Sequence, residues 1–232
     1  MCPDKPSNPL EHSAGDFAHA GARALISLVP VVGGSAAELF SLLVAEPLSK
    51  RRDAWIVEIA ERLKGLENAV QGFSVEGLAE DPGFTTVLLS ATQIAIRTHR
   101  AEKHEALRNA VLNAALGDTP DDDLRAIFLG FVDRLTALHL TVLAAVQRPS
   151  ENEMLVARFQ NVSRGALLPV LTAAVPRLHS PPSLATTIWG DLRSALLVEA
   201  VDLNMMMTGS GLLQKRTTAL GDQLLRFISE PA

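Results

Sequence analysis

The chain has 232 residues, of which 47% are hydrophobic, and its formal net charge is −5. The apolar share is ample for a folded core, so the composition excludes an intrinsically disordered chain, and the length allows one large domain or two small ones. Neither half of the chain has the basic excess that is typical of nucleic-acid-binding proteins. Cys2 is the only cysteine, which excludes an intrachain disulfide and a multi-cysteine metal site.

The first twelve residues are polar and rich in proline, and they predict a flexible tail over residues 1–12. This stretch lacks the basic start and the apolar core of a signal peptide. We therefore expect a cytoplasmic protein, with the periphery of the inner membrane as the alternative location.

The stretch "ALISLVPVVGGSAAELFSLLV", residues 24–44, has a single charge, Glu38. Pro30 and the Gly33–Gly34 pair divide it into two halves that are each too short to span a membrane. We expect an apolar helical hairpin that is buried in a bundle and can be released to a membrane or a protein partner. The residues that define this predicted site are Leu28, Pro30, Val32, Gly33, Gly34, Ala37 and Phe40, followed by the cations Lys50, Arg51 and Arg52.

The apolar residues that follow recur at spacings of three and four, which predicts helices rather than strands. One helix is expected over residues 49–71 and another from residue 84 to the glycine at 117, with a connector at 72–83. A long helix is expected from Thr119 to about residue 147, because Pro120 and the acidic run 121–123 suit a helix start. Residues 13–130 are accordingly predicted to form an N-terminal helical bundle, in which the hairpin is the buried element.

The last third of the chain has a different pattern. Helices are expected over 151–161, 164–178 and 183–197, and strand-like stretches flank "TGSG" at 208–211, which predicts a tight turn. The pieces "IWGDLRSALLVEAV", "MTGSGLLQKRT" and "TTALGDQLLRFI" resemble a bacterial winged-helix domain. The resemblance implies a mainly α fold in which residues 131–232 form a winged-helix-like domain with a small two-stranded β-wing.

The N-terminal part is similar to uncharacterised bacterial helical proteins. The similarity lies in the "P-x-x-G-G" segment that begins at Pro30 and in a "KRRDxW" helix start, residues 50–55. Some proteins of this kind are associated with abortive infection, the self-sacrificing defence against phage. The resemblance implies an interaction or effector protein with a protein partner or self-association.

A winged helix also suggests the alternative function, a dimeric DNA-binding transcriptional regulator. In that case residues 183–197 would enter the major groove and residues 208–216 would form the wing. The expected DNA contacts are Thr186, Thr187, Arg193, Lys215 and Arg216. Three cations are few for a DNA reader, which contacts roughly 6–10 phosphates.

No motif in the chain predicts an enzyme. A phosphate-binding G-x-x-x-x-G-K-[ST] loop and a G-x-S-x-G nucleophile elbow do not occur. His99 and His104 are five residues apart, which is unsuitable for a zinc pair on one helix, and we expect His139 to be a hydrogen-bonded, partly buried side chain. The acidic run 121–123 is explained by helix capping. We therefore expect no catalytic activity, no metal, no cofactor and no small-molecule substrate.

Overall fold

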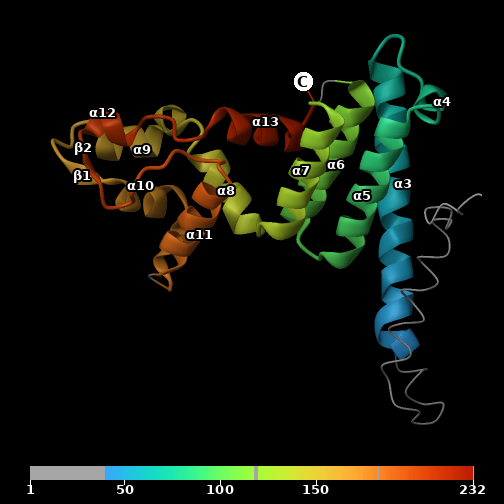
Figure 1. The fold of residues 1–232 in the computed structure, drawn as a ribbon, viewed down its shortest axis with the longest axis horizontal. Helices are drawn as coiled ribbons and strands as arrows, with labels where there is room; N and C mark the ends of the chain where they lie inside the picture. The colour runs from blue at the N-terminus through green and yellow to red at the C-terminus, as the bar shows by residue number, and fades with distance from the viewer. Residues whose placement is uncertain (1–39, 118–119, 182, 232) are drawn as a thin grey trace, which may run out of the picture. The chain divides into compact units, whose positions relative to one another are not determined.

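A computed structural model of the chain describes residues 40–117, 120–181 and 183–231 (Figure 1). These residues are mainly helical and contain one small antiparallel sheet of two strands, as predicted. The chain divides into two compact units, Met1–Ser49 and Lys50–Ala232. The second unit extends across the domain boundary that we expected near residue 130. The tail 1–12 and most of the predicted hairpin lie outside the described residues.

The first described elements are the π-helix η1 (Ser41–Ala45) and α3 (Glu46–Ala69). Helix α3 begins before the predicted residue 49, and Pro47 lies in its first turn, where a proline without an N–H is tolerated. Within α3, the residues Trp55, Ile59 and Leu63 are buried at a spacing of four. This stripe is the core-facing side of the helix, and it follows the predicted helical spacing.

The next helices are α4 (Val75–Leu78), α5 (Pro82–Arg97) and α6 (Ala101–Leu116). The predicted continuous helix to residue 117 is interrupted, because Thr98 is extended and its side chain accepts a hydrogen bond from the backbone of Arg100. Gly117 ends α6 with a positive φ of 73°, a left-handed conformation that favours glycine. The connector predicted at 72–83 contains the short helix α4.

The predicted long helix from residue 119 to 147 is two helices, α7 (Asp122–Arg134) and α8 (Ala137–Ala145), which meet at an angle of 114°. Leu135 is extended between them, and Thr136 begins α8 through a capping box with His139. A capping box satisfies backbone N–H groups at a new helix start, so it fixes the corner. The cap of α7 is Asp121 rather than Thr119, which lies outside the described residues.

The elements after α8 are short. They are η2 (Pro149–Glu151), α9 (Glu153–Phe159), β1 (Gly165–Ala166), α10 (Leu167–Ala174), η3 (Pro176–His179), α11 (Ser183–Ser194), β2 (Met206–Met207), α12 (Gly209–Leu212) and α13 (Ala219–Ile228). Helix α11 ends before the predicted residue 197. Leu196 there adopts a φ of 58°, and the N–H of Leu197 donates to the carbonyl of Leu192, a bond that closes a helix end.

The two strands are not the expected wing. β2 pairs with β1, with Gly165 opposite Met207 and Ala166 opposite Met206, and not with residues 212–219. The "TGSG" segment begins α12, because the Thr208 side chain accepts a hydrogen bond from the N–H of Gly211. The same small polar residues suit a tight turn and a helix cap, and here the cap forms.

Helix α13 packs on α6 and α8 (Figure 1). The rings of Phe128 and Phe227 lie 5.8 Å apart, so the end of α13 contacts the core side of α7. The side-chain amides of Asn109 and Asn113 donate to backbone carbonyls of residues 226–229 at the end of α13. Residues near the chain's end are therefore joined to the helices of its first half.

Candidate functional site

The predicted hairpin site is described only in its last part. Leu28, Pro30, Val32, Gly33, Gly34 and Ala37 lie outside the described residues. Phe40, Leu42, Leu43 and Val44, which we call the apolar segment 40–44, are 39%, 61%, 63% and 37% exposed. No side chain of η1 is buried. Large apolar side chains that are exposed next to one another mark a surface for contact with a partner or a membrane.

The predicted cations Lys50, Arg51 and Arg52 follow in the first turns of α3 and are exposed. Arg52 forms an ion pair of 3.0 Å with Asp53. An apolar segment followed closely by a group of Lys and Arg is the charge pattern of segments that bind anionic membrane surfaces.

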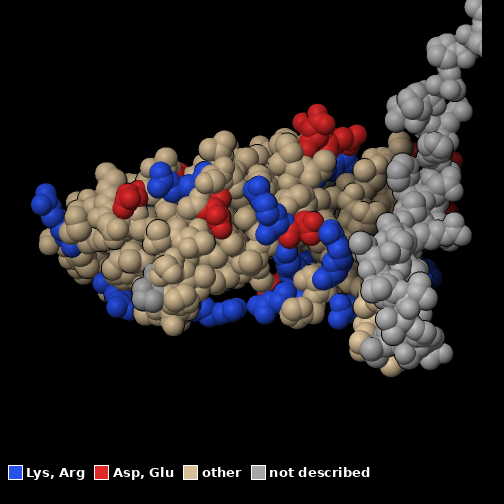
Figure 2. Space-filling model, turned by 60° about the horizontal axis from the view of Figure 1, so that its bottom comes forward, with Lys and Arg blue, Asp and Glu red and all other residues tan. Residues whose placement is uncertain are grey.

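Three of the predicted DNA contacts lie on α11. Thr186, Thr187 and Arg193 are exposed, while the opposite face of α11 buries Ile188, Trp189 and other residues. In Figure 2, the Lys and Arg side chains form several groups, and Asp or Glu side chains lie beside some of them. The surface in this view is therefore of mixed charge.

The other two predicted DNA contacts are engaged within the fold. The guanidinium of Arg216 is buried, lies 3.1 Å from Glu199 and donates to the carbonyl of Gly211. The backbone N–H of Arg216 also donates to the carbonyl of Val146, at 2.9 Å. Arg216 thus joins segments of the fold and does not face solvent.

Lys215, the neighbour of Arg216, forms an ion pair with Asp222. This pair lines a cleft of about 410 Å³, which we call the polar cleft. Six of its seven lining residues are polar or charged; the set is Gln147, Arg148, Lys215, Asp222, Leu225, Arg226 and Ser229. These residues come from the segment after α8, from the segment after α12, and from α13 and its C-cap.

Asp222 organises the polar cleft. Its carboxylate accepts hydrogen bonds from Lys215, from Thr217 at 2.6 Å and from Gln147 at 3.2 Å. Partial burial raises the pKa of Asp222, but these hydrogen bonds and the charge of Lys215 lower the pKa by more, so it lies below its ordinary value. The carboxylate is therefore ionised and holds three segments in place.

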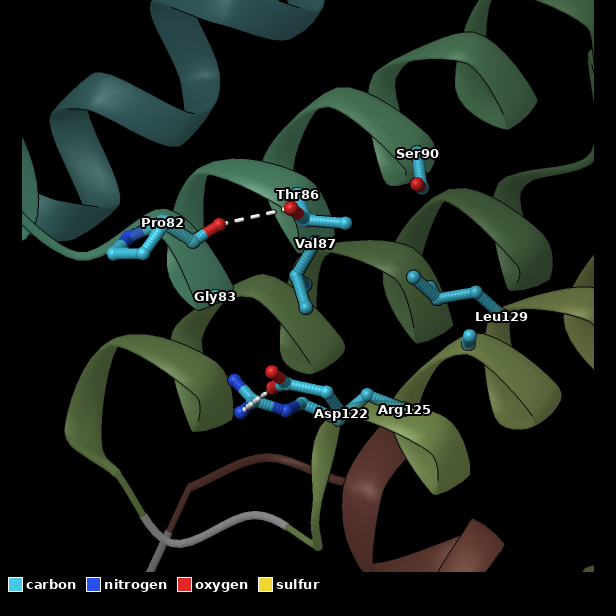
Figure 3. A pocket seen from close by; sticks show the side chains of 9 residues that line it. Pro82, Gly83, Thr86, Val87, Ser90, Asp122, Arg125 and Leu129 are labelled. Carbon is cyan, nitrogen blue, oxygen red and sulfur yellow. Dashed lines mark hydrogen bonds and ion pairs between the residues drawn. The ribbon is translucent and has the colours of Figure 1, made fainter.

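A second pocket, of about 200 Å³, lies between the starts of α5 and α7 (Figure 3). The Arg125–Asp122 ion pair lies on one side of it, and Thr86 donates a hydrogen bond to the carbonyl of Pro82 on the other. A side chain at Gly83 would come within 3.3 Å of the Arg125 guanidinium and the Asp122 carboxylate. Glycine there lets the two helix starts approach, so the pocket is explained by helix packing and capping.

His139 is hydrogen-bonded, as predicted, and is buried rather than partly buried. Its Nδ1 accepts the N–H of Thr136 at 3.2 Å, which assigns the ring proton to Nε2, and Nε2 then donates to Asp191 Oδ2 at 3.2 Å. The Thr136 and Asp191 contacts secure the start of α8 against α11. The ring of His104 is half-buried and packs edge-on against Trp55.

The polar cleft is the part of the surface that sequence patterns missed. Gln147 and Asp222 are 75 residues apart in the chain, and neither belongs to a recognisable motif. Within residues 40–117, 120–181 and 183–231, no group of three or more His, Cys, Asp and Glu side chains could hold a metal ion. Among the same residues no single helix is both long and apolar enough to cross a membrane, although α7 and α8 together have the length and composition, with the bend between them.

The chain has no match among protein-family models, curated proteins or solved structures.

Proposed function

We propose that the protein is a non-enzymatic interaction protein that engages an anionic membrane surface through residues 24–52. The exposure of Phe40, Leu42, Leu43 and Val44 directly before the cations at 50–52 is the observation that carries the proposal. Residues 50–232 act as the folded body that carries this element. The inferred membrane contact is peripheral, since Pro30 and the Gly33–Gly34 pair divide the apolar stretch.

Two contributions to the binding free energy favour a membrane surface as the partner. An exposed leucine that enters an apolar environment gains about 1.5–3 kcal/mol, and the segment 40–44 offers two leucines, a valine and a phenylalanine. Each Lys or Arg near an anionic lipid surface adds about 1 kcal/mol. Together these contributions suffice for reversible binding, and the cationic part makes the binding depend on salt and on lipid charge.

Vesicle co-sedimentation tests the proposal. We expect the full chain to sediment with vesicles that contain anionic lipid and to bind less to purely zwitterionic vesicles. The double variant Leu42→Glu with Leu43→Glu should lower the partition coefficient by at least about tenfold, because it replaces apolar surface with charge. Leu89→Glu on α5, which is 58% exposed in the wild type, is the matched control and should bind normally.

Two outcomes would overturn membrane engagement. One is equal binding by the Leu42/Leu43 variant and the Leu89 control. The other is self-association of the wild type through this segment without lipid, seen as a larger species in sedimentation velocity that the Leu42/Leu43 variant abolishes. That second result would assign the segment to contact with another copy of the chain.

An effector role in abortive infection is the biological form of this proposal, and it rests on the resemblance of the N-terminal part. It predicts that expression of the wild type arrests bacterial growth and that Val32→Asp relieves the arrest. Normal growth at a confirmed high level of the wild-type protein would exclude it.

DNA binding by a winged-helix arrangement of residues 131–232 has less support. Arg216 is buried and Lys215 is paired with Asp222. Of the three predicted cations, Arg193 is exposed and forms no ion pair with the described residues. A salt-dependent DNA shift that Arg193→Ala abolishes would favour the regulator over the membrane protein.

A further inference from the structure

We propose that the polar cleft binds a phosphate group of a small soluble ligand. The inference is independent of membrane engagement, because the residues of the cleft lie in α13 and its C-cap and in the segments after α8 and after α12. The volume of about 410 Å³ falls in the usual range for small-molecule sites, roughly 300–1,000 Å³.

The charge of the lining matches a phosphate. Three cations and one carboxylate line the cleft, and the ion pair between Lys215 and Asp222 neutralises one cation. The remaining cations, Arg148 and Arg226, give the cleft lining a net charge of +2. A phosphate monoester carries about −1.5 to −2 at pH 7, so the two charges match. A guanidinium presents a planar fork of N–H donors that matches phosphate oxygens.

The two arginines are available to a ligand. Arg226 is exposed and forms no ion pair within the described part of the chain. Arg148 lies 3.6 Å from Glu151, but both side chains are about two-thirds exposed. Such a surface pair is worth little, so a phosphate can displace it.

The cleft is held in shape before any ligand enters. Asp222 fixes the ammonium of Lys215 and the amide of Gln147, and the N–H of Arg216 ties this segment to Val146. Asn113 donates to the carbonyls of Arg226, Phe227 and Ser229 at 2.9–3.3 Å. A rigid site loses less entropy on binding than a flexible one.

The same hydrogen bonds from Asn113 reduce the partial negative charge that the end of α13 would present to an anion. The end of a helix carries a partial negative charge on its free carbonyls, and α13 ends beside Arg226. Asn113 and Asn109 occupy those carbonyls from the α6 side. The negative end of α13 is thereby partly neutralised, and the arginine charge dominates in the cleft.

Titration of the full-length, 15N-labelled protein with inorganic phosphate and with pyrophosphate, at constant ionic strength, tests the inference. We expect saturable shifts in the backbone amides of Gln147, Arg148 and Ser229. Arg226→Ala and Arg148→Ala should each weaken binding by about tenfold, which is the usual loss for one charged hydrogen-bonding partner. Arg226→Lys should bind less tightly than the wild type, since it keeps the charge and loses the fork.

Arg177→Ala removes an exposed cation of η3 and is the matched control, which should bind like the wild type. Shifts that do not saturate, or binding that Arg148→Ala and Arg226→Ala leave unchanged, would overturn the proposal. Acetate as a third titrant should fail to saturate the cleft; equal binding of acetate would overturn the assignment to phosphate.

A lipid phosphate is distinguished by vesicle co-sedimentation of the same variants. The Arg148→Ala and Arg226→Ala variants should bind vesicles like the wild type. The Leu42→Glu, Leu43→Glu double variant should lose vesicle binding but keep the phosphate affinity of the wild type in the titration. Binding by the cleft that appears only with phospholipid vesicles would overturn a soluble ligand. If the membrane proposal fails, the phosphate proposal can still stand. If the phosphate proposal fails, the membrane proposal can still stand.

Discussion

Residues 50–145 and residues 146–228 are held together in different ways. In the first region α5 and α6 have 16 residues each, and apolar stripes pack them against their neighbours. In the second region the longest helix, α11, has 12 residues. Its segments are joined by individual contacts, such as the buried Arg216 and the backbone bond from Thr218 to Leu197.

This difference teaches which substitutions matter in each region. An apolar stripe shares its stabilisation among many side chains, so one exposed position of its helix can change with little effect. A close backbone contact or a buried polar bond depends on a single residue. We therefore expect the second region to respond sharply at a few positions, which the following substitutions test.

Two glycine substitutions should have opposite signs. Gly221 lies in α13, and a Cβ there would come within 2.2 Å of the carbonyl oxygen of Leu197. Gly221→Ala should lower the free energy of unfolding by about 3 kcal/mol, because the backbone must shift. Gly65 in α3 has no atom near its Cβ position, and Gly65→Ala should raise the unfolding free energy by about 0.5–1 kcal/mol.

Urea denaturation of both glycine variants makes the comparison directly. Equal and small effects at Gly65 and Gly221 would show that the second region adapts as freely as an exposed helix position.

Asn113 tests the connection between the two regions. Its buried amide donates to three carbonyls at the end of α13. Asn113→Ala should lower the unfolding free energy by about 2 kcal/mol, because buried carbonyls lose their donor. Glu105→Ala on the exposed face of the same helix should change it by less than about 0.5 kcal/mol. Indistinguishable midpoints for these two variants would contradict the role of Asn113.

Leu196 is a position where the second region is strained. Its φ of 58° is a left-handed conformation that costs a residue with a Cβ about 1–2 kcal/mol, and its side chain is 68% exposed. Leu196→Gly should raise the thermal midpoint, with a gain of up to about 1 kcal/mol, since glycine adopts this conformation freely but also loosens the unfolded chain. A lower midpoint would show that the leucine side chain makes a compensating contact.

Asp222 should give the smallest effect, and its signature is that the effect disappears in acid. Because its pKa in the folded state lies below the ordinary value of 3.8, the ionised carboxylate stabilises the fold above that pH. This contribution is lost as the pH falls below 3.8 through the folded-state pKa. The difference in unfolding free energy between wild type and Asp222→Asn should shrink over this range in urea titrations. A difference that stays constant with pH would contradict the assignment.

The sequence predicts the first region better than the second for a physical reason. The stripe of Trp55, Ile59 and Leu63 repeats with the helix, so periodicity locates it. The sequence pattern does not predict the corner between α7 and α8, because apolar residues continue through the corner and no Gly or Pro lies in it. The signal was Thr136 followed three residues later by His139, a less familiar form of the capping box.

In the second region local patterns leave more than one structure open. "TGSG" fits a tight turn and a helix cap equally, and β2 pairs with the distant strand β1, in which Ala166 lies opposite Met206. The polar cleft depends on contacts such as Gln147 to Asp222, which no local pattern encodes. The candidate membrane segment, by contrast, is a local property of composition and charge, so the sequence suffices to propose it.

Hydrogen–deuterium exchange of the full chain with and without anionic vesicles tests the proposed membrane function most directly. We predict that vesicles slow exchange in peptides that cover residues 24–52 and leave peptides of α11 and α13 unchanged. The protection should disappear in the Leu42→Glu, Leu43→Glu variant. Unchanged exchange over residues 24–52 in the presence of vesicles that bind the protein would contradict the account.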